Sequence, residues 1–305
     1  MVIKAWNRLL RLPNLFILAL SQFLVFRFLI LPFFDSDELT LNFNQFLLLI
    51  LGFTMVCASG NVINAIYDRH LDATQESHFI IPKYFSLQFC WMLYISLIGV
   101  GAAISFYLAK TSHQTLLWWI YPLSVFLLWI YSYKLKCFPV LGNLIVAAFT
   151  GLALLFIPFA FRENLNDLRM LDYSLWAQLN YRFLMLGIFA MLCNLCRELC
   201  KDLEDSIPDQ AQQCQSTAVF YGIPTAKKMT LWCMFALDAL LVLDMIRQPT
   251  AFNQVLAIVF ALAPASYCSF QLYKSFQQKD FAHVSASLKF LMLSGLILFC
   301  VLYEF

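Results

Sequence analysis

Nine apolar stretches of this chain are each long enough to cross a membrane as a helix, and they constrain the fold more than any other feature. A helix needs about 20 mostly apolar residues to span the hydrocarbon core of a bilayer. The alternating apolar pattern of membrane-barrel strands is absent. The sequence therefore predicts an all-α polytopic membrane protein with nine transmembrane helices. The predicted spans are 13–34, 44–66, 86–109, 115–132, 140–161, 181–200, 229–247, 252–273 and 285–304.

Composition supports the same fold class and excludes others. Of the 305 residues, 62% are hydrophobic and 12% are charged, whereas soluble domains carry about a quarter charged residues. A soluble globular enzyme and a disordered tail are therefore excluded. The net charge of +2 is too small to indicate a nucleic-acid partner. Because no long polar segment interrupts the apolar stretches, we expect a single integral-membrane domain over residues 1–305.

The distribution of Lys and Arg predicts the orientation of the chain in a cell or inner membrane. Cytoplasmic loops of membrane proteins carry an excess of these residues. The N-terminal segment and the loops after spans 2, 4, 6 and 8 hold fourteen of them, against five on the opposite side. We therefore expect a cytoplasmic N-terminus and a C-terminus outside.

Three of the ten cysteines, Cys193, Cys196 and Cys200, share one face of predicted span 6. Such spacing superficially suggests a metal or redox motif. Cysteine also behaves as a small apolar residue inside membrane helices. We interpret these three as packing residues and expect no metal site there.

The first acidic cluster begins where predicted span 2 ends. Asn64, Asp68 and Asp72 are spaced four residues apart, with Asn61 one turn earlier. On a helix these side chains form one polar stripe. Two carboxylates on adjacent turns repel each other unless a cation lies between them. The spacing therefore favours a cation-binding helix end.

A second acidic cluster follows predicted span 6. Asp202, Asp205 and Asp209 have helical spacing, Glu204 lies among them, and Glu198 precedes them by one turn. Proline disfavours a helical conformation in the residue before it. We therefore expect Pro208 to end this helix at Ile207.

Four crossings separate the ends of predicted spans 2 and 6, so both clusters are expected on the cytoplasmic face. Oxygen-rich clusters suit Mg²⁺, which takes one or two carboxylates and completes its shell with water and phosphate oxygens. The simpler alternative is a pair of solvated helix ends with ordinary loop charges. Two clusters of matching spacing on one face favour the metal site.

Basic residues near both clusters suit a diphosphate, whose charge Mg²⁺ neutralises only in part. For Lys134 and Lys136, the alternative is a plain topology signal. Tyr131 is a candidate for orienting a substrate, or else an interface tyrosine. The candidate diphosphate-binding residues are Arg69, Lys134, Lys136, Arg197 and Lys201.

At these residues the chain resembles the UbiA superfamily of membrane prenyltransferases, whose members have nine helices and two Asp-rich motifs. Asn64–Asp72 matches the first motif, NDxxDxxxD, except at its second position, and Lys201–Asp209 matches the second, KDxxDxxxD. The likeness extends to Arg11-Leu12-Pro13-Asn14, Tyr131-Ser132, Gly142-Asn143 and Ser216-Thr217.

The resemblance implies a UbiA-like helical bundle that transfers an isoprenoid chain from an allylic prenyl diphosphate to a lipid-soluble acceptor, with Mg²⁺ as cofactor. The acceptor would be an aromatic ring or a glycerol-lipid hydroxyl, in lipid or quinone biosynthesis. It implies catalytic roles for Asp68, Asp72, Asp205 and Asp209, which with Asp202 would hold the metal. Asn64 and Tyr131 would join the basic residues in binding substrate.

Within the superfamily, the second motif is most similar to that of the geranylgeranylglycerol-phosphate geranylgeranyltransferase branch, with chlorophyll synthase nearby. The motif reads Arg197-Glu198-x-x-Lys201-Asp202-x-Glu204-Asp205. Two departures stand out. Ala65 replaces the first Asp of the family motif, and Glu76–Pro82 lacks the usual Arg-Pro. On a helix Ala65 would lie at the edge of the polar stripe, where an Asp would add an oxygen ligand.

Two alternatives remain open at this point. An ion-coupled transporter would need charges near the bilayer midplane, and Asp238 is the one clear acid in such a position. A degenerate, non-catalytic UbiA homologue is the other, because of Ala65.

Overall fold

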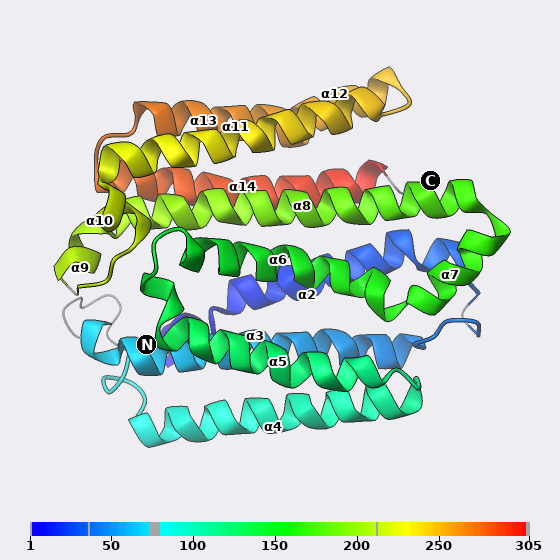
Figure 1. Cartoon of the computed structure of the whole chain (residues 1–305), viewed down its shortest axis with the longest axis horizontal. Helices are drawn as coiled ribbons and strands as arrows, with labels where there is room; N and C mark the ends of the chain where they lie inside the picture. Colours follow the sequence, from blue (N-terminus) through cyan, green and yellow to red (C-terminus); the bar gives the residue numbers. More distant parts are fainter. Residues whose placement is uncertain (1, 36, 73–79, 212, 303–305) are drawn as a thin grey trace. The chain divides into compact units, whose positions relative to one another are not determined.

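The computed structural model describes residues 2–35, 37–72, 80–211 and 213–302. Among these residues every regular element is a helix and there is no strand (Figure 1). Nine helical stretches within the described part are long and apolar enough to cross a membrane, so the predicted fold class is confirmed. They are Leu12–Phe33, Phe43–Arg69, Leu87–Thr111, Thr115–Tyr133, Leu141–Ala160, Tyr173–Glu204, Ile223–Arg247, Ala251–Lys274 and Gln278–Leu302.

The helices divide into two compact units, which are described separately. The first comprises residues 1–135 and 157–170, and the second comprises residues 136–156 and 171–305. The prediction of a single domain over the whole chain stays a prediction.

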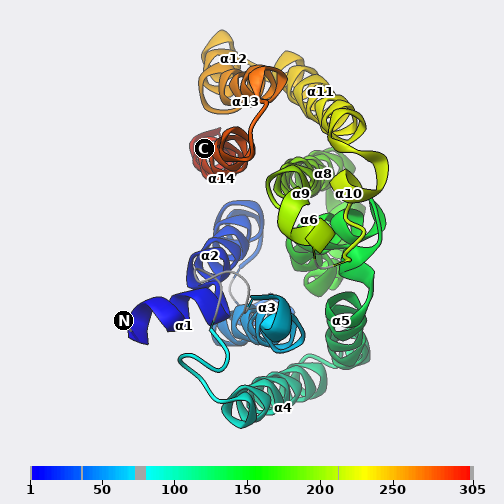
Figure 2. The ribbon, with the colours of Figure 1, turned by 90° about the vertical axis from the view of Figure 1, so that its left-hand side faces the viewer.

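The first unit is built around α3. Its elements are α1 (Val2–Leu10), α2 (Leu12–Leu29), η1 (Leu31–Phe33), α3 (Phe43–Asp72), α4 (Leu87–Thr111), α5 (Thr115–Tyr133) and α7 (Arg162–Leu171). Helix α3 packs against α4 and α5, and α1 lies against α3 (Figures 1 and 2).

The end of α3 that carries the first acidic motif is anchored by an apolar cluster. Val62, Ile63 and Ile66 are buried together with Ala5 and Leu9 of α1. The side-chain amide of Asn61 also donates to the main-chain carbonyl of Leu10, at 2.8 Å. The short basic N-terminal segment is therefore a helix that holds the motif helix in place.

The opposite end of the first unit is closed by side-chain amides. Asn164 of α7 is buried, accepts from the main-chain N–H of Thr40 at 2.9 Å and donates to the carbonyl of Glu38 at 2.8 Å. Gln114 donates to the carbonyl of Ala160 at 2.9 Å. These bonds satisfy main-chain groups of the connection before α3 and the last carbonyl of α6.

The second unit is built around α8 (Tyr173–Glu204), which packs against α11 (Ile223–Arg247) and α14 (Gln278–Leu302). The remaining elements are η2 (Leu135–Cys137), α6 (Leu141–Ala160), α9 (Ser206–Ala211), α10 (Thr217–Tyr221), α12 (Ala251–Ala257), η3 (Ile258–Leu262) and α13 (Ala263–Lys274). The last two residues of η2 belong to this unit, and residues 157–160 of α6 belong to the first.

The core of the second unit contains Cys193, Cys196 and Cys200, all fully buried beside Leu288 and Leu291 of α14. The interpretation of these cysteines as packing residues is therefore confirmed.

Helices α6 and α8 approach closely at two glycines. A Cβ atom on Gly151 would lie 2.7 Å from the main-chain oxygen of Gly187, and a Cβ on Gly187 would lie 2.7 Å from Leu155. Small residues at such crossings let two backbones meet inside a membrane. This crossing helps to fix α8, which carries the second acidic motif.

Candidate active site

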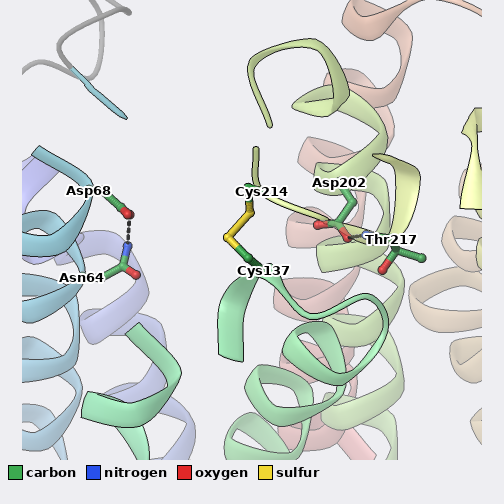
Figure 3. Close-up of a disulfide and its surroundings, with 6 residues drawn as sticks. All are labelled: Asn64, Asp68, Cys137, Asp202, Cys214 and Thr217. Carbon is green, nitrogen blue, oxygen red and sulfur yellow. Dashed lines mark hydrogen bonds between the residues drawn. A yellow bond between two sulfur atoms is a disulfide. The ribbon is translucent and has the colours of Figure 1, made fainter. Parts of the chain in front are cut away.

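The first acidic motif lies on continuous helix, as predicted. The side-chain amide of Asn64 donates to Oδ2 of Asp68 at 2.8 Å (Figure 3). Helix α3 extends to Asp72, its last residue; the side chain of Asp72 lies outside the described residues, as does most of Glu76–Pro82. Asn64 and Asp68 therefore form one pre-arranged polar pair at the end of α3.

Two neighbours of this pair have other contacts. Arg69 donates from Nη1 to the main-chain oxygen of Ile66 at 2.7 Å, which holds its side chain along α3. Ala65 packs against the apolar cluster that contains α1 residues, and it is half-buried. Its methyl group thus contributes to the apolar side of α3.

The second acidic motif follows an almost continuous helical path. Helix α8 ends at Glu204, and Asp205 caps it by donating its main-chain N–H to Lys201 at 2.8 Å. The next helix, α9, begins at Ser206, and the N–H of Asp209 donates to the carbonyl of Asp205 at 2.9 Å. The helical spacing predicted for the three aspartates is preserved across the junction.

The prediction that Pro208 ends the helix at Ile207 is wrong. Ile207 is helical, and Pro208 lies in the first turn of α9. A proline is tolerated in the first turn because its missing N–H has no partner within the helix there. The break comes earlier, at Asp205.

Asp202 is held by a main-chain donor from a distant segment. The N–H of Thr217, at the start of α10, donates to Oδ2 of Asp202 at 2.9 Å (Figure 3). The side chain of Asn143, near the start of α6, lies within hydrogen-bonding reach of the same carboxylate. One oxygen of Asp202 is therefore already engaged by the protein.

The electrostatics of Asp209 reflect a crowded acidic site. Burial raises the pKa of its carboxyl above the ordinary value, and a hydrogen bond with Ser216 lowers it. The Asp205 carboxylate raises the pKa, whereas Lys201 and Lys136 lower it. Because burial has the largest effect and a second carboxylate lies nearby, this cluster favours a positively charged ligand.

The predicted basic residues have different surroundings. Lys136 and Lys201 lie close enough to Asp209 to interact with it. Arg197 forms an ion pair with Glu198 and donates to Oδ1 of Asn194 at 3.2 Å, so its charge is already balanced. Lys134 is exposed at the C-cap of α5, and Tyr131 is half-buried in the last turns of that helix.

Sequence reasoning missed a disulfide and gave no role to two buried polar residues. Cys137 and Cys214 form a disulfide across a sequence separation of 77 (Figure 3), and Asn143 and Thr217 are buried. One signal was present: these two cysteines lie outside the apolar stretches that hold the other eight. Their pairing had no local signature.

The donor set fits Mg²⁺ better than a structural metal. Within the described residues, no group of three or more His, Cys, Asp and Glu side chains is arranged to hold a metal. The available donors are carboxylate and amide oxygens, and Mg²⁺ binds through one or two carboxylates when phosphate oxygens and water fill the remaining positions. The Asp205–Asp209 cluster meets this requirement.

Comparison with known proteins gives the family. The model of the UbiA prenyltransferase family matches residues 24–295, which is most of the chain and includes both acidic motifs. The chain belongs to the UbiA prenyltransferase family. The resemblance inferred from the motifs is therefore confirmed.

One relative in the UbiA family is a protein of Methanobrevibacter smithii named digeranylgeranylglyceryl phosphate synthase. It is 30% identical to this chain over 181 residues, which cover 58% of each protein. The match therefore spans less than two thirds of that relative's length.

Solved structures share the fold. A structure described as that of digeranylgeranylglyceryl phosphate synthase in membranes aligns with a TM-score of 0.66 and 21% identity, over 100% of this chain and 99% of the other. A UbiA homologue from Archaeoglobus fulgidus bound to DMAPP and Mg²⁺ aligns with a TM-score of 0.58 and 15% identity, over 95% and 98% of the two chains. These likenesses confirm the UbiA-like helical fold.

Proposed function

We propose that this protein transfers an isoprenoid chain from an allylic prenyl diphosphate to a lipid-soluble acceptor. The observation that carries the proposal is the second acidic motif, where Asp205 and Asp209 lie together beside Lys136 and Lys201. An arrangement of carboxylates and lysines suits a diphosphate bound with a divalent cation. Membership of the UbiA family supports this reading.

We propose that both acidic motifs face the cytoplasm. Four spans separate the motif at the end of α3 from the motif at the end of α8, so both emerge on the same side of the membrane. The excess of Lys and Arg on that side supports a cytoplasmic site and N-terminus, with the C-terminus outside. Membrane lipid surrounds the nine spans and would deliver the acceptor.

Asp68, Asp72, Asp205 and Asp209 would hold the cation, because each motif offers two carboxylates in helical spacing. The Archaeoglobus fulgidus homologue, bound to DMAPP and Mg²⁺, supports the same cofactor here. When bound, Mg²⁺ supplies positive charge against the leaving diphosphate. Asn64 orients Asp68 through its side-chain amide.

Some of the basic residues would bind the diphosphate, and one would support the wall of the site. Lys136 and Lys201 are the strongest candidates to bind diphosphate oxygens, since both interact with Asp209. Arg69, Lys134 and Tyr131 would complete the binding of the donor. Arg197 would act through its pair with Glu198, as part of the wall of the site.

The chemistry exchanges one carbon–oxygen bond for another bond at the same carbon. The bond between the allylic carbon and the diphosphate oxygen breaks, the diphosphate keeps the electron pair, and the acceptor's nucleophilic atom bonds to the carbon and loses its proton. Positive charge that develops on the allylic carbon is stabilised by aromatic faces in a dry site. The protein supplies no covalent nucleophile.

A glycerol-lipid hydroxyl is the acceptor that we favour over an aromatic ring. The wording of the second motif resembles the geranylgeranylglycerol-phosphate branch, and the relative from Methanobrevibacter smithii carries the name digeranylgeranylglyceryl phosphate synthase. Both point to an ether lipid of glycerol phosphate.

The experiment is a product analysis by mass spectrometry with the purified protein in lipid vesicles. Several prenyl diphosphates are supplied with either a prenylated glycerol phosphate or an aromatic acceptor, in the presence and absence of Mg²⁺. We expect a product with a second prenyl chain on the glycerol lipid, formed only with Mg²⁺. An ion-coupled transporter or a non-catalytic homologue would form no product with any acceptor.

A further inference from the structure

Two segments beside the second acidic motif are joined by a covalent bond and by hydrogen bonds. The first, residues 137–143, leads into α6, and the second comprises residues 209–211 of α9 and residues 213–217, which lead into α10. The Cys137–Cys214 disulfide links them, and the main-chain N–H of Val140 donates to Oγ1 of Thr217 at 2.9 Å (Figure 3). We call this pair of linked segments the clamp.

Thr217 is the residue at which the clamp meets the motif. Its side chain is fully buried. Its hydroxyl accepts the bond from Val140 and donates to Oδ1 of Asn143 at 2.9 Å. Its own N–H donates to Oδ2 of Asp202 at 2.9 Å. One threonine therefore ties α6, α10 and the end of α8 together.

The other end of the 209–217 segment is fixed to the motif as well. The N–H of Cys214 donates to the main-chain oxygen of Asp209 at 3.0 Å, next to the disulfide. The segment is thus attached to the motif at Asp209 and at Asp202. Asp205, which lies between them in sequence, caps α8 at the junction with α9.

We propose that Thr217 is a positioning residue for the second acidic motif. This inference rests on the proposed function, because the positioned motif is the one that would hold Mg²⁺ and the diphosphate. In it, Asp202 anchors the motif to the clamp, and Asp205 and Asp209 are left as the ligands.

The second acidic motif needs positioning because its neighbouring carboxylates repel one another. Asp202, Asp205 and Asp209 repel one another when no cation is present, and the repulsion tends to spread them apart. The bonds through Thr217 oppose that spreading before the cation arrives. A site that is arranged in advance binds its ligand with less reorganisation.

The test compares Thr217→Val with Thr217→Ser in the full-length protein. Valine keeps the volume and the main-chain N–H but removes both hydroxyl bonds, whereas serine keeps the hydroxyl. The first readout uses Mg²⁺ without a prenyl substrate: the Mg²⁺ concentration that gives half of the cation-induced rise in melting temperature. We expect Thr217→Val to raise this midpoint roughly ten-fold, an effect of the size expected for the loss of these hydrogen bonds, and Thr217→Ser to restore it.

The second readout is kinetic. We expect Thr217→Val to raise the KM for the prenyl diphosphate at fixed Mg²⁺ more than it lowers kcat, because the motif binds the diphosphate through the cation. A lower melting temperature with an unchanged Mg²⁺ midpoint would show that Thr217 only supports the fold, and would overturn the inference. If Thr217→Val does not fold, Asn143→Ala, which removes the acceptor of the Thr217 hydroxyl, takes its place with the same expected outcomes.

The proposed reaction and the positioning role of Thr217 can be contradicted separately. If wild-type protein transfers no prenyl chain but the Thr217→Val midpoint still shifts, the proposed reaction is wrong and the positioning role stands. If Mg²⁺ does not stabilise the wild-type protein at all, the positioning role toward a metal is wrong, whatever the activity.

Discussion

Asn64 and Asp68 are joined one turn apart on α3, with the Asn64 amide 2.8 Å from Oδ2 of Asp68. This bond occupies one oxygen of the carboxylate and fixes its direction on the helix. A carboxylate with a fixed direction loses little freedom when it binds a cation. The first motif is therefore more than two acidic side chains at a helix end.

Replacement of Asn64 by leucine should weaken cation binding. The variant removes the hydrogen bond to the Asp68 carboxylate, and a bond to a charged group contributes about 1.5–3 kcal/mol. We expect a roughly ten-fold or greater rise in the Mg²⁺ concentration needed for prenyl transfer. A Mg²⁺ titration of turnover measures it.

Asn61→Ala is the matched control for that experiment. Asn61 lies on the same helix but bonds to the Leu10 carbonyl of α1. Its loss should lower the melting temperature and leave the Mg²⁺ requirement near that of the wild type. Equal Mg²⁺ requirements in the Asn64 and Asn61 variants would argue against a special role for Asn64.

The departure from the family motif at Ala65 leads to a second prediction. Motif spacing alone suggests that an aspartate there would add a ligand. In the structure the Ala65 methyl packs against the apolar cluster that includes α1 residues. Ala65→Asp would bring a charge against that cluster. We expect a lower melting temperature and no decrease in the Mg²⁺ requirement, measured on the same preparations; a decrease would mean that position 65 reaches the metal.

The glycine crossing of α6 and α8 gives a third prediction. A Cβ on Gly151 would meet the main-chain oxygen of Gly187 at 2.7 Å, and a backbone atom cannot move aside cheaply. Gly151→Ala should therefore destabilise the protein by about 1–3 kcal/mol, the usual cost of overpacking. Gly99→Ala is the control, because a Cβ there meets nothing within 4 Å. Thermal unfolding in detergent compares the two, and equal melting temperatures would contradict the tight crossing.

Much of the fold could be predicted from sequence because the bilayer restricts the options. A long apolar stretch has to become a helix in lipid, where every main-chain polar group needs an internal partner. The first and last residues of the helices were harder to predict. Helix α8 begins at Tyr173 rather than near residue 181, because Asp172 caps it by accepting a hydrogen bond from the main-chain N–H of Leu175. Pro208 was misjudged because the effect of a proline depends on where in a helix it falls.

The candidate site could be predicted only as two local motifs. Spacing of four residues is readable within one helix, so the Asn64–Asp68 pair and the path from Asp202 to Asp209 were visible in the sequence. The contacts of Thr217 with Asp202 and Asn143 join residues that are far apart in the chain. No local pattern encodes such contacts, and the same holds for Cys137 and Cys214. The balance of the Arg197 charge by Glu198 also required the structure.

The central claim is that the carboxylates of the second motif support prenyl transfer, and one measurement tests it most directly. Turnover of Asp205→Asn is compared with that of Asp238→Asn in lipid vesicles with Mg²⁺, a prenyl diphosphate and a prenylated glycerol phosphate. Asp238 lies within α11 and is bonded to Ser269, at 3.0 Å. We predict that Asp205→Asn loses at least about 100-fold in turnover, because a cation at a leaving group contributes several kcal/mol, while Asp238→Asn stays near the wild type. Near-normal turnover of Asp205→Asn, with folded protein in the membrane, would contradict the account.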